Sequence, residues 1–444
     1  MKRHFLRHLS LLSYCSRLVK HSHYAGLMLL SALFASLSGP SVVAQEATEP
    51  QFSGFYDRVY QIVVLEDETN NKSALGSGFQ ISGDGLVVTN YHVISQLVFE
   101  PENHRVEFVD KDEKKGALEL ITFDVINDLA ILRRVEGQAP HLELSTAPPS
   151  RGDSIYSLGN PHDIGMLMVS GAYNGLAESD YTPRILFSGS LNSGMSGGPT
   201  LNERGEVVGV NVSTAGSQLS FLVPVAQVVS LLSQVDSPLQ VKDYFSHIRE
   251  QIATFQRDYF AQLFAGDWTL EDLGDAAQVP GEMGLDTTCW GQSNEQNKDA
   301  LHKRLNLTCG NSNNIYLQPY FSTGVLHYSY DYREREKLGK FRFHNHTGDS
   351  SYYPDNRGSS ESVSNYSCEQ TYLERDEGAP EDHYIQVGFC SRAYLDFADL
   401  YDVLYYRQSA GADSALTSHF TLAGVDEETV AKFTERFARE VKWK

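Results

Sequence analysis

Positive charge is scarce in this chain of 444 residues. Lysine and arginine together number 36 against 57 aspartates and glutamates, which gives a formal net charge of -21. A surface with this balance repels phosphate groups instead of neutralising them. The composition therefore argues against a nucleic-acid partner and against binding to an anionic membrane.

Long hydrophobic runs are also lacking. The apolar stretch from Ala25 to Leu37 is too short to span a bilayer, so we expect no stable membrane span. A basic stretch without acidic residues precedes it and Val42-Val43-Ala44 follows, which together predict a signal peptide over residues 1–44 and a periplasmic or secreted protein. A mitochondrial or other organellar transit peptide and an uncleaved anchor remain as alternatives.

Cysteine is rare, with five residues, and Cys15 lies in the segment expected to be removed. The other four are Cys289, Cys309, Cys368 and Cys390. No C-x-x-C spacing is present, which disfavours a metal site, and we expect neither a metal nor a cofactor. An even number of cysteines in an exported chain indicates two disulfides, with three possible pairings. The short loops, Cys289 to Cys309 and Cys368 to Cys390, are the first hypothesis.

Long helical periodicity is missing between Phe55 and Val235. Short apolar runs such as R-V-Y-Q-I-V-V-L and V-V-G-V-N-V alternate there with Gly, Asn, Asp and Pro. This pattern predicts a mainly β fold, and the length suffices for two small barrels.

The pattern changes after Asp236-Ser237-Pro238. Apolar residues then recur at helical spacing from Val241 to Phe264. Alternating stretches rich in Tyr, Ser and Asn follow, including K-F-R-F-H from Lys340, and predict further strands. The acidic start and basic end of D-E-E-T-V-A-K-F-T-E-R-F-A-R-E-V predict a terminal helix. We therefore divide the chain into a first β domain (50–236), a helical linker (240–268) and a β-rich C-terminal domain (280–444).

Three residues are candidates for catalysis. Ser196 lies in G-M-S-G-G-P, where glycines allow main-chain amides to approach a ligand closely. A serine hydroxyl needs a base and an orienting acid. His92 follows the apolar run G-L-V-V-T-N-Y, and Asp128 leads directly into the strand-like L-A-I-L. Taken singly, each has a structural interpretation: a hairpin loop, a satisfied histidine and an aspartate at a strand edge.

Together these segments resemble a known family. G-S-G-F-Q-I-S-G-D-G-L-V-V-T-N-Y-H-V-I, D-L-A-I-L, S-L-G-N-P, L-N-S-G-M-S-G-G-P-T-L-N-E-R-G-E-V-V-G-V-N and F-L-V-P-V occur in the order found in HtrA/Deg-type, trypsin-like serine proteases. The resemblance covers about residues 55–235 and implies a trypsin-like double β-barrel. It also implies a catalytic triad of Ser196, His92 and Asp128, with an oxyanion hole built from the amides of Gly194 and Ser196. Asp124 is a second candidate for the acid.

The sequence departs from that family at several positions. Met195 stands where the family has Asn or Asp, so activation through a new N-terminus paired with that carboxylate is not expected. By the same resemblance, the substrate pocket includes Ser190, Asn192, Asn211 and Ser213. Ser190 at its base carries no charge, which predicts cleavage after small or medium apolar residues.

The C-terminal region resembles no family that we recognise, and no PDZ-like carboxylate-binding loop follows residue 240. His344 and His346 could be metal ligands, although exposed histidines in a polar hairpin are the simpler interpretation. The tyrosines from Tyr316 to Tyr332 could stack against a ligand, but core and sheet-face positions are favoured. The region could bind substrate, a partner or a second copy, so an oligomer is possible.

Two other functions compete with the protease. G-M-S-G-G also satisfies the G-x-S-x-G motif of α/β-hydrolases, but that motif requires a helix directly after the serine. Here Pro199 and the turn N-E-R-G precede another strand. The second alternative is a binding protein with a protease fold, whose site is silent or gated and whose C-terminal domain binds a partner.

Overall fold

The structure is a computed structural model, and it describes residues 52–135, 139–160, 165–177, 181–214, 216, 218–284, 286–311, 314–348, 358–375 and 378–444. The predicted signal peptide and its cleavage point near Ala44 lie outside these residues. Among the helices described, none is long and apolar enough to cross a membrane.

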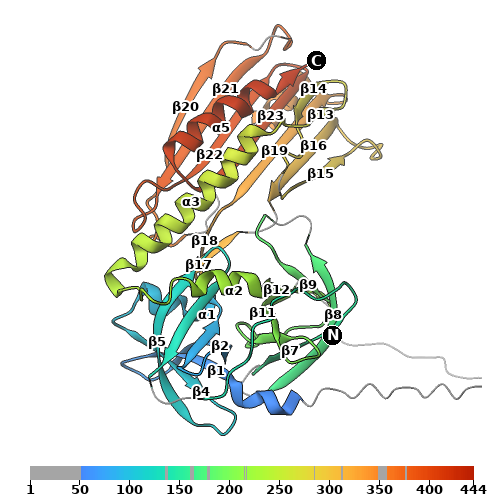
Figure 1. Cartoon of the computed structure of the whole chain (residues 1–444). Helices are drawn as coiled ribbons and strands as arrows, with labels where there is room; N and C mark the ends of the chain where they lie inside the picture. Colours follow the sequence, from blue (N-terminus) through green and yellow to red (C-terminus); the bar gives the residue numbers. More distant parts are fainter. Residues whose placement is uncertain are drawn as a thin grey trace, which may run out of the picture. The chain divides into compact units, whose positions relative to one another are not determined.

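Two closed barrels of six antiparallel strands form the first part of the described chain (Figure 1). The first barrel follows the short helix η1 (Phe52–Arg58) and contains β1 (Val59–Glu66), β2 (Lys72–Gln80), β3 (Leu86–Thr89), β4 (His104–Val109), β5 (Lys115–Asp124) and β6 (Leu129–Arg134). The second contains β7 (Ser154–Gly159), β8 (Leu167–Leu176), β9 (Ile185–Phe187), β10 (Pro199–Leu201), β11 (Val207–Thr214) and β12 (Ser220–Pro224). The predicted mainly β, double-barrel fold is confirmed.

One helix lies between strands of the first barrel, and the others follow the second barrel and lead to the remaining sheets. They are α1 (Tyr91–Phe99) inside the first barrel's sequence, α2 (Val225–Leu232) after the second, and then η3 (Val241–Asp243) and α3 (Tyr244–Ala265). The buried residues of α3 include Ile248, Ile252, Tyr259 and Leu263, which recur at the spacing of one helix face. This helix covers the range in which the sequence indicated helical periodicity.

The C-terminal region is built on a seven-stranded antiparallel sheet in the order β15-β16-β19-β23-β22-β21-β20. Its strands are β15 (Thr287–Ser293), β16 (His302–Asn311), β19 (Leu326–Arg335), β20 (Ser367–Leu373), β21 (Tyr384–Ala393), β22 (Tyr401–Ala410) and β23 (Ser414–Val425). Smaller units are the sheet of β13 (Leu270–Leu273), β14 (Ala277–Pro280) and β24 (Lys442–Trp443), and the hairpin of β17 (Ile315–Gln318) and β18 (Phe321–Thr323).

Helices α3 and α5 (Glu427–Glu440) run along this sheet in Figure 1. Phe433 and Phe437 of α5 are fully buried and share a core with Tyr259 and Phe260 of α3 and with sheet residues. The side chain of Asp426 caps α5 by accepting a hydrogen bond from the Thr429 amide at 2.8 Å, as expected for an acidic helix start.

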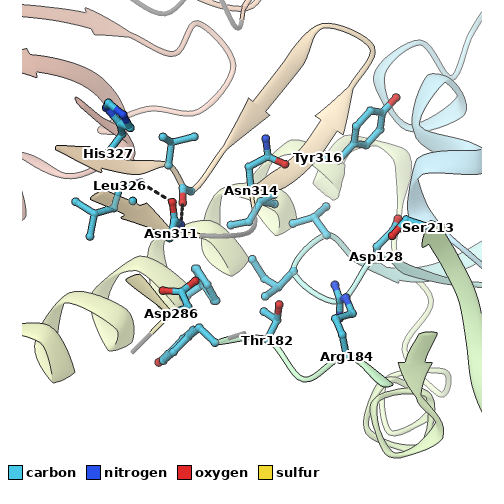
Figure 2. A pocket seen from close by; sticks show the side chains of 18 of the residues that line it. Asp128, Thr182, Arg184, Ser213, Asp286, Asn311, Asn314, Tyr316, Leu326 and His327 are labelled. Carbon is cyan, nitrogen blue, oxygen red and sulfur yellow. Dashed lines mark hydrogen bonds between the residues drawn. The ribbon is translucent and has the colours of Figure 1, made fainter. Parts of the chain in front are cut away.

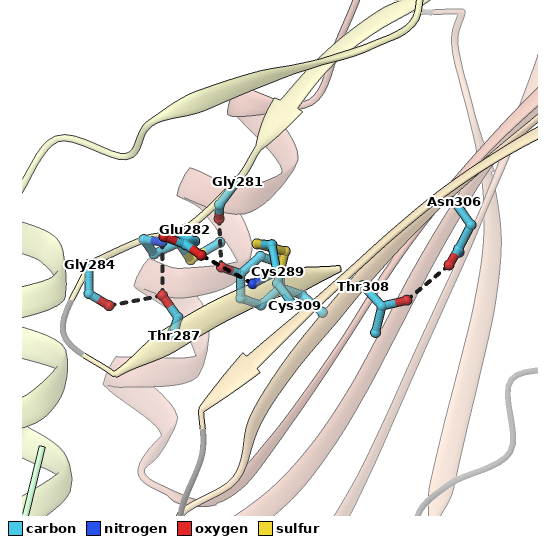
Figure 3. The surroundings of a disulfide bond; sticks show 10 residues. Gly281, Glu282, Gly284, Thr287, Cys289, Asn306, Thr308 and Cys309 are labelled. Carbon is cyan, nitrogen blue, oxygen red and sulfur yellow. Dashed lines mark hydrogen bonds between the residues drawn. A yellow bond between two sulfur atoms is a disulfide. The ribbon is translucent and has the colours of Figure 1, made fainter. Parts of the chain in front are cut away.

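Both disulfides have the predicted pairing. Cys289–Cys309 joins β15 to β16 (Figure 3), and Cys368–Cys390 joins β20 to β21. Each bridge therefore fastens one edge strand of the seven-stranded sheet to its neighbour.

One strand prediction is wrong. The segment Lys340–His344 belongs to helix α4 (Lys340–Gly348) and not to a strand. Its alternation of aromatic and basic residues does not select a strand face here, because Phe343 is fully buried while Phe341 is 89% exposed. A two-residue period over five residues is too short to separate a strand from one turn of a helix.

Candidate active site

His92 is the second residue of α1, and its ring is held by Asp128. Asp128 Oδ2 lies 2.7 Å from His92 Nδ1, while Asp128 Oδ1 accepts the main-chain amide of His92 at 2.8 Å. The second bond satisfies one of the amides that a helix start leaves without an internal partner. Asn90, the residue before the helix, donates from Nδ2 to the Asp128 carbonyl at 2.7 Å. One aspartate thus fixes both the helix start and the imidazole.

The turn that carries Asp128 adopts an unusual backbone. Asp128 has a φ of 59°, in the left-handed region that residues with a Cβ seldom occupy. It stands directly before β6, so this conformation turns the carboxylate from the strand toward α1. A strained backbone conformation of this kind persists only where surrounding contacts stabilise it. Here the three hydrogen bonds that join Asp128 to His92 and Asn90 do so.

The carboxylate of Asp128 stabilises the protonated form of the His92 imidazole. Burial by itself lowers the pKa of His92, but the charge of Asp128 and its hydrogen bond outweigh that effect, so the pKa is raised above the usual value. The imidazole can therefore accept a proton and remain stabilised as the imidazolium. The carboxylate of Asp124, the second candidate for the acid, accepts from the amides of Ile126 and Asn127, and no hydrogen bond among the described residues joins it to His92.

Ser77 of β2 holds the loop around Ser196. Its hydroxyl donates to the Gly194 carbonyl at 2.7 Å, and its amide donates to the Ser196 carbonyl at 2.7 Å. The same hydroxyl accepts from the Asn160 amide at 2.9 Å. Ser77 is fully buried, so these bonds are shielded from competition with water. The first barrel thereby fixes a loop that belongs to the second.

Asn211 of β11 fixes the same loop from behind. Its Nδ2 donates to the carbonyls of Met195 and Leu158 at 3.2 and 3.0 Å, its Oδ1 accepts from Thr200, and its main-chain carbonyl accepts from the Gly197 amide. The side chain is fully buried. This corrects the prediction that Asn211 lines a substrate pocket, because its polar atoms are all occupied inside the barrel.

These bonds leave two amides available beside Ser196. The carbonyls of Gly194, Met195 and Ser196 are all engaged, which fixes the peptide planes on either side of Ser196. Among the hydrogen bonds of the described residues, neither the Gly194 nor the Ser196 amide has an acceptor. Gly194 has a φ of 91° and Gly197 a φ of 84°. A Cβ on Gly197 would also lie 2.2 Å from the Ser77 carbonyl, so only glycine fits.

The hydroxyl of Ser196 donates to the Val212 carbonyl of β11 at 3.0 Å, and within the described residues it has no bond to His92. The two residues are nevertheless brought close together. A Cβ on Gly197 would lie 2.9 Å from the Asn90 amide, just before α1, and one on Gly76 would touch both Val93 and the Ser196 carbonyl. The Ser196 loop therefore rests on the first turn of the helix that carries His92.

The other predicted residues occupy different surroundings. Met195 is fully buried in an apolar cluster with Ile155, Phe187 and Leu191, and this contact anchors the loop. An aspartate at the same position would need an ion pair to be buried there. Ser190 and Asn192 are exposed on the segment before Ser196, and Ser190 Oγ accepts from the Gln218 amide at 3.1 Å.

The histidine pair in α4 gives no sign of a metal centre. The His346 ring packs on His302 at 4.7 Å between centroids, and the His344 ring packs on Tyr384 at 6.1 Å. Across the parts of the chain that the structure describes, no group of three or more His, Cys, Asp and Glu side chains could hold a metal ion.

A cavity of about 780 Å³ lies beside the His92–Asp128 pair, and Figure 2 shows the side chains that line it. Asp128, Thr182, Arg184 and Ser213 come from the barrels, whereas Asn314, Tyr316, Leu326 and His327 come from the C-terminal region. Ser213, a predicted pocket residue, therefore does line a cavity. Sequence reasoning missed the C-terminal contribution, because nothing in N-I-Y-L-Q-P-Y-F distinguishes Tyr316 from a tyrosine on a sheet face.

Two tyrosines join α1 to the hairpin β17–β18: Tyr91, which belongs to α1, and Tyr316, which belongs to β17. Tyr91 Oη donates to the Leu317 carbonyl of β17 at 2.9 Å, and the Tyr316 ring meets the His92 ring edge-on at 6.1 Å. Tyr316 Oη is 3.5 Å from Ser95 Oγ, one turn further along α1. The hairpin β17–β18 thus packs directly on the helix that carries the imidazole.

Comparison with known proteins agrees with this geometry. Residues 76–210 match the model of the trypsin-like peptidase domain. Protease Do-like 5, chloroplastic, from Arabidopsis thaliana is 32% identical over 216 residues, which cover 43% of this chain and 65% of that protein. A probable periplasmic serine endoprotease DegP-like from Ectopseudomonas mendocina (strain ymp) is 31% identical over 209 residues, covering 44% of this chain and 43% of that protein.

Among solved structures, the serine endoprotease from Yersinia pestis matches with a TM-score of 0.37 and 22% identity over 41% of this chain and 64% of that one. The chain spans less than two thirds of the length of these relatives. Residues 76–210 form a trypsin-like peptidase domain, and over this part the chain is a homologue of the DegP/HtrA-like serine proteases.

Proposed function

We propose that the chain is a serine endopeptidase that hydrolyses peptide bonds of protein substrates. The observation that carries the proposal is the pairing of His92 with Asp128 at 2.7 Å next to Ser196, where two main-chain amides have no acceptor among the described residues. A base oriented by a carboxylate and a preorganised anion site are the two requirements for acyl transfer to a serine.

The reaction follows from this arrangement. Ser196 Oγ attacks the scissile carbonyl carbon while His92 Nε2 takes the hydroxyl proton, and Asp128 stabilises the imidazolium that forms. The carbonyl oxygen becomes an oxyanion and accepts hydrogen bonds from the Gly194 and Ser196 amides. His92 then gives the proton to the leaving amine, and water, activated by the same imidazole, releases the acyl group.

Before attack, the Ser196 hydroxyl must leave the Val212 carbonyl and rotate toward His92. Rotation about one side-chain bond is fast compared with turnover, so the bond at 3.0 Å does not prevent catalysis. We further propose that Ser190, which carries no charge, forms the base of a specificity pocket that selects small or medium apolar residues before the cleaved bond.

We propose an exported location, periplasmic or secreted. The N-terminal apolar stretch behind a basic segment supports it, as do relatives named as periplasmic and chloroplastic. Fractionation of the expressed full-length chain, followed by N-terminal sequencing of the exported form, tests this. A mature start near residue 45 is expected, and an intact N-terminus in the cytoplasm contradicts it.

A binding protein with a silent site is the second candidate, and the Ser196–Val212 bond is the observation that favours it. Incubation with an unfolded protein substrate, using wild type and Ser196→Ala, separates the two functions. Cleavage by the wild type alone supports the endopeptidase. Binding of the substrate by both forms without cleavage by either supports the silent site.

A further inference from the structure

The cavity beside the catalytic residues has a wall that the protease domain does not supply. One side of it consists of barrel residues, and in Figure 2 Asn314 and Tyr316 of the C-terminal region lie on the opposite side from Thr182 and Arg184. At about 780 Å³ its volume falls within the range of ligand sites. The two regions therefore enclose one space, and both are needed to form it.

The C-terminal wall is fixed in place. Leu317 and Phe321 of the hairpin are buried in the same core as Tyr91 of α1. At the base of the hairpin, Asn311 donates from Nδ2 to the Gly324 carbonyl at 2.7 Å and accepts from the Leu326 amide at 2.9 Å. Burial of these large apolar side chains stabilises this docking. The wall is thus part of the folded core.

The barrel side of the cavity contains an open strand edge. Ser213 and Thr214 of β11 pair with β12 on one side, whereas β10 pairs with β11 only as far as Val210. Within the described residues no strand covers the other edge at Ser213. An extended polypeptide can add to such an edge through main-chain hydrogen bonds. The carbonyl of Val212, the neighbour of Ser213, accepts a hydrogen bond from the Ser196 hydroxyl. The open edge therefore begins beside the proposed nucleophile.

We propose that this cavity binds an extended segment of the polypeptide substrate next to the scissile bond, with Asn314 and Tyr316 of the C-terminal region as its far wall. The inference rests on the proposed endopeptidase function. The lining includes the side chains of Asn314 and Thr182, which can bond to a peptide main chain or to polar side chains. Substrates that reach into the cavity gain binding that shorter ones lack.

The test fills the cavity without touching the catalytic residues. Asn314 is exposed within it, so Asn314→Trp introduces bulk where the substrate segment would lie. Tyr320→Trp is the control, because Tyr320 lies in the turn of the hairpin β17–β18 that Asn314 precedes, is 91% exposed and lies outside the cavity lining. Two series of peptides with one cleavage site are lengthened on either side of it, and kcat/KM is measured for each.

With wild type and Tyr320→Trp, kcat/KM is expected to rise by about tenfold or more as one series is lengthened, and with Asn314→Trp that rise is lost. The rate of labelling by a small fluorophosphonate stays within about twofold in all three proteins, since that probe does not reach the cavity. An equal rise in Asn314→Trp, or no rise in wild type, overturns the inference. Absence of labelling in wild type overturns the proposed function instead.

Discussion

Replacing Ser77 by alanine tests whether the amides beside Ser196 are held in place by the first barrel. The substitution removes one oxygen atom and leaves the Gly194 carbonyl and the Asn160 amide without their partner in a buried place. Each orphaned group costs about 1–3 kcal/mol of folding free energy. The peptide plane between Gly194 and Met195 is then free to rotate. This peptide lies in the chain between the Gly194 and Ser196 amides, which are proposed to bind the oxyanion.

The expected result is a loss of activity beyond the loss of stability. If rotation displaces one amide donor, kcat falls by about 10²- to 10³-fold, and the rate of fluorophosphonate labelling falls with it. Urea unfolding gives the stability of the same preparation, so that activity is compared under conditions where both proteins are folded. Ser73→Ala is the control, since Ser73 is on the same strand but exposed, and its hydroxyl only contacts the Val64 carbonyl at 3.3 Å.

Wild-type kcat in Ser77→Ala, together with a lowered free energy of unfolding, would refute this reasoning. The loop would then hold its active form without the bond from β2.

Three further predictions concern titration and cross-links. Neutral His92 is the proposed base, so activity rises as pH rises through its raised pKa, and Asp128→Asn is expected to move this rise to lower pH and to lower kcat by about 10⁴-fold; a pH–rate profile unchanged in position contradicts it. Burial lowers the pKa of His419 to about 3, so the unfolded chain binds a proton there before the folded one does. Its contribution to stability is full above about pH 6.5 and falls by about 1.4 kcal/mol per pH unit below it. In His419→Asn this part of the acid sensitivity should vanish, as measured by urea unfolding at several pH values, and an identical slope in wild type and variant would disprove the assignment. Reduction of the disulfides, which close loops of 20 and 22 residues, should lower the free energy of unfolding of the C-terminal sheet by about 3 kcal/mol each; unchanged urea midpoints after complete reduction argue against this.

The sequence was informative where chemistry constrains local patterns. Short apolar runs between turn residues predicted the barrels, because strands of closed barrels need that alternation. The cysteine pairs lie on directly hydrogen-bonded strands, Cys289 opposite Cys309 and Cys368 opposite Cys390, so the short-loop pairing was also the one that strand geometry permits. The assignment of catalytic roles to Ser196, His92 and Asp128 stays a prediction until activity is measured.

Other features depend on contacts between distant segments. Tyr91 and Leu317 are separated by 226 residues, and no local pattern reports that their regions share a core. Asn211 resembles a pocket residue in the sequence, but tertiary packing buries it behind the Ser196 loop. Lys340–Gly348 forms a helix in which Phe343 is fully buried, and an alternation over five residues does not distinguish this helix from a strand. Sequence periodicity reports which face is buried, and it does not report what covers that face.

The central claim is that Ser196 is a nucleophile activated by His92. Intact-mass measurement after incubation with a fluorophosphonate tests it most directly, using wild type, Ser196→Ala and His92→Ala. The account predicts one label per wild-type chain, mapped to the peptide containing Ser196, none in Ser196→Ala, and labelling slowed by about 10³-fold or more in His92→Ala. Labelling of Ser196→Ala at the wild-type rate, or equal rates in wild type and His92→Ala, would contradict it.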